Sequence, residues 1–302
     1  MRRFGNLRLF AAVLAIALML PGVAAAQGIM PAGGLLGSYQ DPSWNYTGLQ
    51  LPAPAAQFMP LEILYPSYLA GPKEPRIGTQ LFKESDDGML WDTTLGGRFG
   101  WLRGTSFDGR RIWQIDVEGG AILRLDPNEN IDLRSVDFRA GIPLTMAWGV
   151  HRFKFGYYHL SAHIGDEFLL KNPTFNRLNY VRDAFVFGYA RYLSERVRVY
   201  GEASWAFYSD VSEPWQFQFG YENAPTRPTG IWGSPFVAVN AQLRQEVDYS
   251  GTTTLHAGWA WRGARAGRLL RTGFFLQTGK SHQYEFYDTS ETQIGAGLWY
   301  DF

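Results

Sequence analysis

The sequence predicts an all-β protein: a transmembrane antiparallel β-barrel of about 12 strands, of the Gram-negative outer-membrane type. Three observations predict it. From Ile77 onward the dominant hydrophobic period is two residues, which is typical of strands. Aromatic side chains make up 16% of the 302 residues and there are 34 glycines, yet the mean hydropathy is only −0.20. The final segment alternates apolar residues and ends on Phe302.

Charge and cysteine content exclude several classes of protein. The chain has 28 Lys and Arg against 28 Asp and Glu, so its formal net charge is zero. Neutralising phosphates needs surplus basic residues, so no nucleic-acid partner is expected. The chain is too apolar for intrinsic disorder. It contains no cysteine, so it has neither a disulfide framework nor a thiolate metal site.

Residues 1–26 are predicted to be a secretory signal peptide. A basic start that includes Arg2 and Arg3 precedes an apolar run from Leu9 to Leu20, and Ala26 completes a small-x-small cleavage pattern. The alternative is a membrane anchor, but the apolar run is shorter than a spanning helix and a cleavage site follows it. We therefore expect Sec export, cleavage near Ala26 and final location in the bacterial outer membrane.

Residues 27–76 are expected to be a proline-rich, extended segment that lies in the periplasm or plugs the barrel. Half of the chain's 16 prolines fall here, and proline lacks the donor that a sheet ladder needs. The run MPLEILYPSYLAGPKEPR, residues 59–76, is too apolar for a free linker. We expect it to pack on or inside the following domain; a disordered tether is the alternative.

Residues 77–302 are predicted to form the barrel. Apolar and polar side chains alternate as in WQFQFGYE, residues 215–222. About twelve such segments, of a length that suits tilted membrane strands, are found. They lie near residues 77, 91, 111, 131, 151, 178, 197, 214, 235, 253, 269 and 291. An even number of strands returns the carboxyl terminus to the periplasm.

Alternation alone does not distinguish this barrel from a secreted β-sandwich or a lipocalin-like barrel. Aromatic residues clustered at strand ends, many charges on the second face and the final Phe302 favour the membrane barrel. Membrane lipids are then expected partners. The strand that ends at Phe302 looks like the signal read by the barrel-insertion machinery, which is a second expected partner. The charged face should pair across the lumen through Arg98, Asp116, Glu118, Arg139, Lys154, Glu202 and Arg244.

One strand carries polar side chains where lipid is expected. The outward face of residues 151–164 reads Phe153, Phe155, Tyr157, His159, Ser161 and His163. Ionisable groups on a lipid face are costly, which suggests a function. His159 shares a face with Ser161 and could take its proton as general base. If the hairpin turn is centred near Phe168, Asn176 lies opposite Ser161 and can orient the imidazole.

The stretch GYYHLSAHIGD followed by FNRLNYVR, with the strand number and the final Phe, resembles bacterial outer-membrane phospholipase A. The resemblance implies an acyl hydrolase that acts on outer-leaflet lipids. In it Ser161 is the nucleophile, His159 the base and Asn176 the orienting residue. It also implies a calcium ion at Asp166, seven residues after the histidine. A homodimer is a further expectation, because a second copy could complete the pocket.

A second resemblance leads to a different function. The run SYLAGPKEPR before an aromatic barrel is similar to an outer-membrane barrel family of unknown function, which implies no activity. The alternative is therefore a non-enzymatic barrel, either a narrow pore or a structural surface protein. His159, Ser161 and His163 would then line the headgroup girdle. The remaining histidines are expected in the lumen or in loops: His151, His256 and His282.

Overall fold

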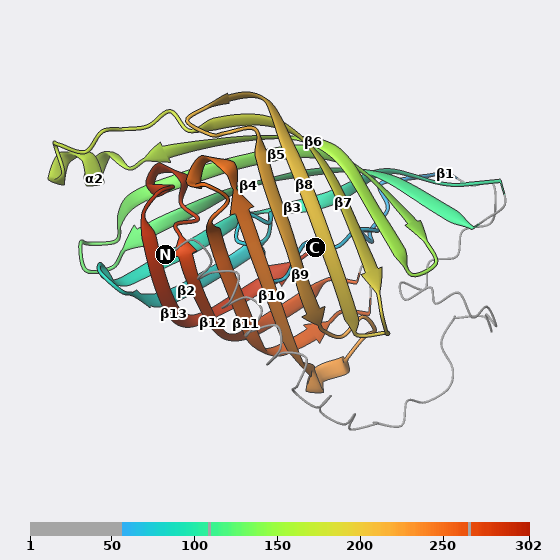
Figure 1. Ribbon diagram of the computed structural model, residues 1–302. Coiled ribbons are helices and arrows are strands. Elements are labelled where there is room, and N and C mark those ends of the chain that lie inside the picture. Colours follow the sequence, from blue (N-terminus) through green and yellow to red (C-terminus); the bar gives the residue numbers. More distant parts are fainter. Residues whose placement is uncertain (1–55, 108–109, 265–266) are drawn as a thin grey trace.

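The computed structural model describes residues 56–302, except 108–109 and 265–266 (Figure 1). The predicted signal peptide and most of the proline-rich segment lie outside the described residues. Twelve strands pair antiparallel with their neighbours in the chain, and β2 (Ile77–Glu84) pairs with β13 (Ser290–Asp301) to close the sheet. The predicted all-β barrel is confirmed.

The remaining elements follow in chain order. The strands between the closing pair are β3 (Gly88–Thr105), β4 (Arg111–Asp126), β5 (Asp132–Trp148), β6 (His151–Ile164), β7 (Val181–Tyr192), β8 (Val197–Asp210), β9 (Trp215–Asn223), β10 (Ser234–Arg244), β11 (Gly251–Arg262) and β12 (Leu269–Lys280). Short helices occupy loops: α2 (Asp166–Lys171), η1 (Gly230–Trp232), η2 (Gln245–Val247) and η3 (Tyr284–Phe286). Within the described ranges, no helix has the length and apolar character needed to cross a membrane.

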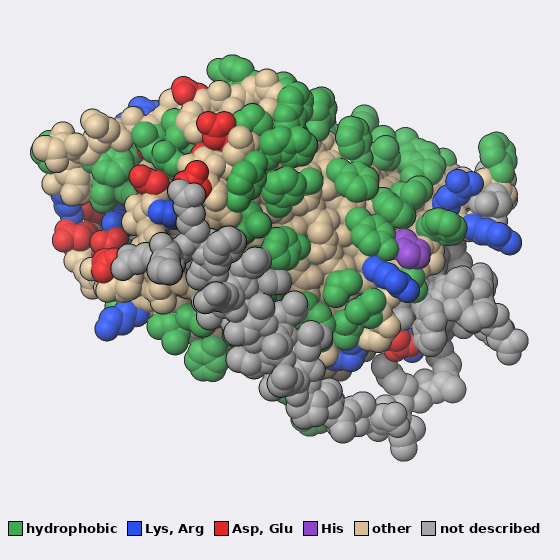
Figure 2. All heavy atoms as spheres, viewed as in Figure 1, with side chains coloured by type: hydrophobic (Ala, Val, Ile, Leu, Met, Phe, Trp, Pro, Cys, Tyr) green, Lys and Arg blue, Asp and Glu red, His purple; other side chains and the backbone are tan. Residues whose placement is uncertain are grey.

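The two faces of the wall follow the two-residue period. In β6 the even-numbered side chains are buried in the lumen, whereas the odd-numbered ones are partly or fully exposed on the outside. Strand residues alternate in this way because successive Cβ atoms point to opposite faces of a sheet. Figure 2 shows hydrophobic side chains over much of the visible wall and charged side chains gathered toward its two ends. A wall of this kind suits a hydrocarbon surround.

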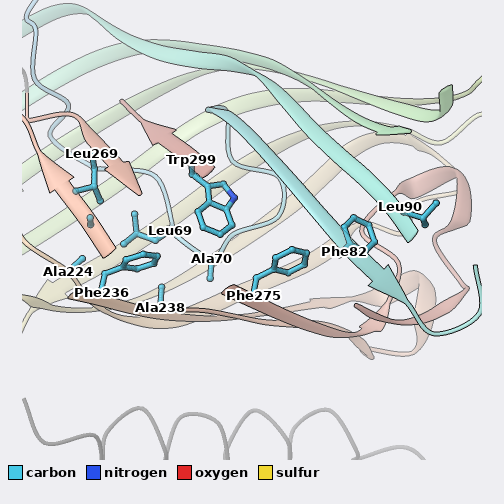
Figure 3. Close-up of a cluster of buried hydrophobic side chains, with 11 residues drawn as sticks. Leu69, Ala70, Phe82, Leu90, Ala224, Phe236, Ala238, Leu269, Phe275 and Trp299 are labelled. Carbon is cyan, nitrogen blue, oxygen red and sulfur yellow. The ribbon is translucent and has the colours of Figure 1, made fainter. Parts of the chain in front are cut away.

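The segment before β2 lies inside the barrel. Strand β1 (Ala56–Phe58) pairs with the end of β3 that extends beyond β2, and Phe58 stands opposite Leu102. Residues 63–76, which we call the plug, are mostly buried in the lumen. Figure 3 shows two plug residues gathered with aromatic side chains from the wall, in a cluster that includes Leu69, Ala70, Phe236, Phe275 and Trp299.

Glycines in the wall make room for this segment. A Cβ at Gly188 would lie 3.0 Å from the Tyr65 hydroxyl oxygen and 3.1 Å from that of Tyr68. A Cβ at Gly100 would lie 2.6 Å from a ring carbon of Pro60. Larger residues at these two positions would push the segment away from the wall. The lumen is therefore shaped to hold it.

Candidate active site

The polar residues singled out on β6 lie near the end of the barrel that carries its longest loop. Figure 1 shows α2 at this end and β1 at the opposite end, where β3 extends beyond the start of β2. Outer-membrane barrels have short periplasmic turns and longer extracellular loops. The loop of residues 165–180, which contains α2, therefore marks the extracellular end. His159 and Ser161 lie toward this end of β6, on its outward face.

His159 and Asp183 form the central contact of the site. His159 on β6 pairs directly with Asp183 on β7, and its Nδ1 lies 2.9 Å from the Asp183 Oδ1. The Tyr157 hydroxyl donates to the same carboxylate oxygen at 2.6 Å. The side chains of His159 and Asp183 are 41% and 20% exposed, so both groups remain accessible from outside the barrel. Because the carboxylate contacts Nδ1, the orientation of the imidazole is fixed and its Nε2 does not contact the carboxylate.

Ser161 lies two residues beyond His159 on the same outward face. It stands opposite Val181 on β7 and Phe138 on β5. Two residues along a strand span about 6.6 Å, a separation that side chains bridge readily. In the part of the chain that the structure describes, the Ser161 hydroxyl makes no hydrogen bond. The nucleophile and the base therefore share a face, but no hydrogen bond joins them in this state.

The predicted position of Asn176 is wrong. Ser161 pairs with Val181, so the hairpin is centred midway between them, at residue 171 rather than near Phe168. The helix α2 and the extended stretch after it lengthen the loop, and Asn176 is exposed within that loop. Asn176 therefore does not lie opposite Ser161, and the hydrogen bond to His159 comes from another residue.

Sequence reasoning missed Asp183, although a signal was present. The outward face of β7 carries aromatic residues such as Phe185 and Phe187, and Asp183 is the one acidic residue in that series. A carboxylate among lipid-facing aromatic residues is as unusual as the histidine and serine opposite it. The two-residue alternation within β7 alone would have placed Asp183 on the outer wall, the wall that carries His159.

Among the residues that the structure describes, Asp166 stands apart from other acidic and histidine side chains that could share a metal ion. Asp166 is the exposed first residue of α2, and Gly165 precedes it as the cap. Calcium in proteins takes six to eight oxygen ligands, several of them carboxylates. Across the described ranges, no group of three His, Cys, Asp or Glu side chains could hold a metal ion.

The lumen is filled by ion pairs between the charged faces of the strands. Arg98 pairs with Glu118, and a second arginine, Arg139, lies 3.3 Å from the other oxygen of that carboxylate. Lys154 pairs with Glu202. The predicted charged residues do pair inside the barrel, but they do so between neighbouring or nearby strands along the wall and not across the lumen, since Arg98 and Glu118 are register partners on β3 and β4. The pairs also satisfy charges that would otherwise be buried without partners at high cost.

The plug fits between these charges. Arg198 donates to the carbonyls of Pro66 and Ser67, each at 2.8 Å. Lys73 pairs with Asp137 on β5; burial lowers the pKa of this lysine, while the carboxylate acts in the opposite direction. Three cavities between plug and wall have volumes of about 20, 20 and 80 Å³. Cavities of this size hold a few water molecules.

The closed antiparallel sheet and its apolar outer wall together define an outer-membrane β-barrel, and the plug occupies its lumen. The chain belongs to the family described as "Protein of unknown function (DUF1207)", which matches residues 66–302. None of the curated proteins matches it. This membership agrees with the predicted resemblance to an outer-membrane barrel family of unknown function.

Solved structures of outer-membrane proteins share the fold. Outer membrane phospholipase A from Escherichia coli is 10% identical, with a TM-score of 0.50 over 78% of this chain and 93% of that one. The outer membrane phospholipase dimer of Salmonella typhi, solved with bound calcium, is 12% identical, with a TM-score of 0.49 over 78% and 91%. A mutant of the Rh. blastica porin is 11% identical, with a TM-score of 0.31 over 76% and 99%.

Proposed function

We propose that the protein is an acyl-ester hydrolase that acts on outer-leaflet lipids from the outer wall of its barrel. Ser161 is the nucleophile, His159 the general base and Asp183 the residue that orients it. The observation that carries the proposal is the contact of 2.9 Å between His159 Nδ1 and Asp183 Oδ1 on the lipid-facing side. Ionisable residues in this environment are rare and are a functional hypothesis by default.

Asp183 takes the role that the resemblance implied for Asn176. A carboxylate that accepts from Nδ1–H selects the tautomer in which Nε2 is the free base, and it stabilises the imidazolium that forms later. The Tyr157 hydroxyl donates to the same oxygen at 2.6 Å, which restricts rotation of the carboxylate. Nε2 of His159 is then available to a serine on the same face, two residues along the strand.

The reaction follows from these positions. His159 Nε2 takes the proton of the Ser161 hydroxyl while Oγ attacks the ester carbonyl. The imidazolium gives that proton to the departing alcohol oxygen, which releases a lysolipid and leaves the fatty acyl group on Ser161. Water, deprotonated by His159, then attacks the acyl-serine. Fatty acid leaves, and the proton returns to the Ser161 oxygen.

Apolar side chains around the site suit an acyl chain. Phe138, opposite Ser161 on β5, is 47% exposed, and Phe185 on β7 is 45% exposed. The substrate of such a site is a lipid whose acyl chain already lies along the wall, with its ester near the outer interface. A second copy packed on this face would cover the site. Sedimentation of the detergent-solubilised protein tests that homodimer.

Fatty-acid release from a bilayer phospholipid by the purified barrel tests the proposal. Ser161→Ala should abolish release, whereas His163→Ala should retain it. His163 faces outward two residues further along and stacks edge-on against Phe138, with ring centroids 5.8 Å apart. It is therefore a matched control for a change on the same wall. Equal release by wild type and Ser161→Ala would refute the hydrolase.

A closed structural barrel is the second candidate, and the filled lumen favours it over a pore. Contacts such as those of Arg198 hold the plug in the lumen, and a cavity lined by the described plug and wall residues has a volume of about 80 Å³. Planar-bilayer recording separates the roles. Silence without hydrolysis would support a structural protein, and steady current through the wild type would support a pore.

A further inference from the structure

A second polar cluster lies on the outer wall, at the opposite end of the same two strands. His151 begins β6 and pairs directly with Arg191 on β7. Both belong to the outward-facing series of their strands, so the prediction that His151 is a lumen or loop residue is wrong. This is the end at which β13 finishes, which is the periplasmic side. Figure 2 shows a histidine and basic side chains among hydrophobic ones at the end opposite α2.

Aromatic groups hold the imidazole of His151 in place. Its Nδ1 lies 2.8 Å from the Tyr189 hydroxyl, and the two rings stack with centroids 5.9 Å apart. The ring of Trp148 lies 6.0 Å away on the other side. When Tyr189 donates to Nδ1, Nε2 carries the ring hydrogen. That hydrogen has no acceptor among the residues that the structure describes.

The guanidinium of Arg191 also lacks a partner. Arg191 is exposed and makes no ion pair or hydrogen bond within the described ranges. The acid in the following turn, Glu195, is paired with Arg227. Directly opposed residues have Cβ atoms about 5 Å apart, so one anion can accept from both side chains. Arginine is the side chain best suited to two parallel bonds with a phosphate.

The distance between the two polar clusters is close to the distance between the two interfaces of the membrane. His159 follows His151 by eight positions in the sequence, which is about 26 Å along a strand. With the usual tilt of about 40°, this becomes about 20 Å along the membrane normal, close to the height of the apolar band of such barrels. The odd-numbered residues between them are all aromatic: Phe153, Phe155 and Tyr157. His151 and Arg191 therefore lie at the level of inner-leaflet headgroups.

We propose that Arg191 and His151 bind the phosphate of an anionic phospholipid in the inner leaflet of the outer membrane. The guanidinium supplies charge and two donors, and His151 Nε2 supplies a third donor. Trp148 and Tyr189 flank the phosphate at the depth where aromatic residues meet headgroups. The site is distinct from the hydrolytic one, which lies at the other end of the strands, and it does not depend on hydrolysis.

Native mass spectrometry of the folded, detergent-solubilised full chain tests this site. The protein is given equal amounts of phosphatidylglycerol and phosphatidylcholine, which differ in net charge. Wild type should retain more phosphatidylglycerol. Arg191→Gln should lower that retention at least about tenfold, because it removes the charge and both guanidinium donors. Equal retention of both lipids by wild type, or no change in the variant, would overturn the proposal.

Arg227→Gln is the matched control. It removes one arginine from the same end of the barrel, but that arginine already has a carboxylate partner. It should leave phosphatidylglycerol retention unchanged; a loss as large as that of Arg191→Gln would mean general charge attraction and refute the site. If Arg191→Gln does not fold, Arg191→Lys and His151→Asn replace it. Each should weaken retention of the anionic lipid, and wild-type retention by both would contradict the proposal.

Discussion

Asp183 on β7 stands directly opposite His159 on β6, and its Oδ1 lies 2.9 Å from the imidazole Nδ1 on the outside of the barrel. Because Ser161 follows two residues later on the same face, a serine, a histidine and an acid lie close together on a wall otherwise rich in exposed aromatic and aliphatic side chains. The pairing of β6 with β7 alone sets this relationship, so the site depends on two adjacent strands.

The identity of the orienting residue is the sharpest test of the site. Asp183→Asn should lower kcat for ester hydrolysis by roughly two to four orders of magnitude, because the amide favours the wrong imidazole tautomer. Asn176→Ala should retain activity, since Asn176 is exposed in the loop after α2. Steady-state kinetics on a short-chain ester measures both. The reverse pattern would restore Asn176 to the role implied by the resemblance.

The role of Asp166 gives a second prediction. This residue stands exposed at the start of α2, and in the described ranges it belongs to no group of three His, Cys, Asp or Glu side chains that could hold a metal ion. Asp166→Asn should therefore hydrolyse ester at the wild-type rate, and added chelator should leave that rate unchanged. Fatty-acid release with and without EDTA measures this. If the substitution and the chelator each abolish release, a calcium ion at Asp166 takes part.

The plug should contribute to stability through its buried ion pair. Lys73→Met leaves the Asp137 carboxylate buried without its cation and should lower the free energy of unfolding by about 3–5 kcal/mol. Lys171→Met is the control, since this lysine is 47% exposed and bonds to surface carboxylates. It should be neutral within error. Urea unfolding in detergent gives both values. Equal stability of the two variants would contradict a structural role for the plug.

The carboxyl terminus should matter for assembly in the membrane. The Phe302 ring packs over Gly97 of β3, where an added Cβ would lie 2.9 Å from it, and contacts Tyr300 edge-on. Deleting Phe302 should reduce the fraction of folded barrel in the outer membrane. Phe107→Ala changes an aromatic residue that is 91% exposed and should not reduce it. Heat-modifiable mobility on gels measures the folded fraction. Normal assembly of the deletion would argue against recognition through this residue.

The strands could be predicted from the sequence because a two-residue period identifies both faces of a strand at once. In β6, this period alone places His159 and Ser161 outside and Lys154 in the lumen. The register in which β6 pairs with β7 was harder to predict from the sequence. The expected partner of Ser161, Asn176, and the observed one, Val181, differ by five residues, an odd number that swaps the two faces of β7. Here the loop contains α2, Val181 takes the place opposite Ser161 expected for Asn176, and Asp183 contacts His159.

The contacts of the plug and of His151 could not be predicted from the sequence, because they too depend on how separate segments are placed against one another. Arg198 binds the plug through backbone carbonyls, and a carbonyl has no signature in the residue type. The placement of His151 depends on its strand beginning directly after a turn, where strand and loop residues look alike. Its contacts with Trp148 and Tyr189 become evident only once β5, β6 and β7 are side by side.

Labelling by a fluorophosphonate probe tests the central claim most directly, because the probe reacts only with an activated serine. The folded, detergent-purified barrel should be labelled at Ser161, as peptide mass spectrometry would show. His159→Ala should abolish the label, since no base would then activate the hydroxyl. An unlabelled wild-type protein, or a label on Ser161 that survives His159→Ala, would contradict the proposed catalytic site.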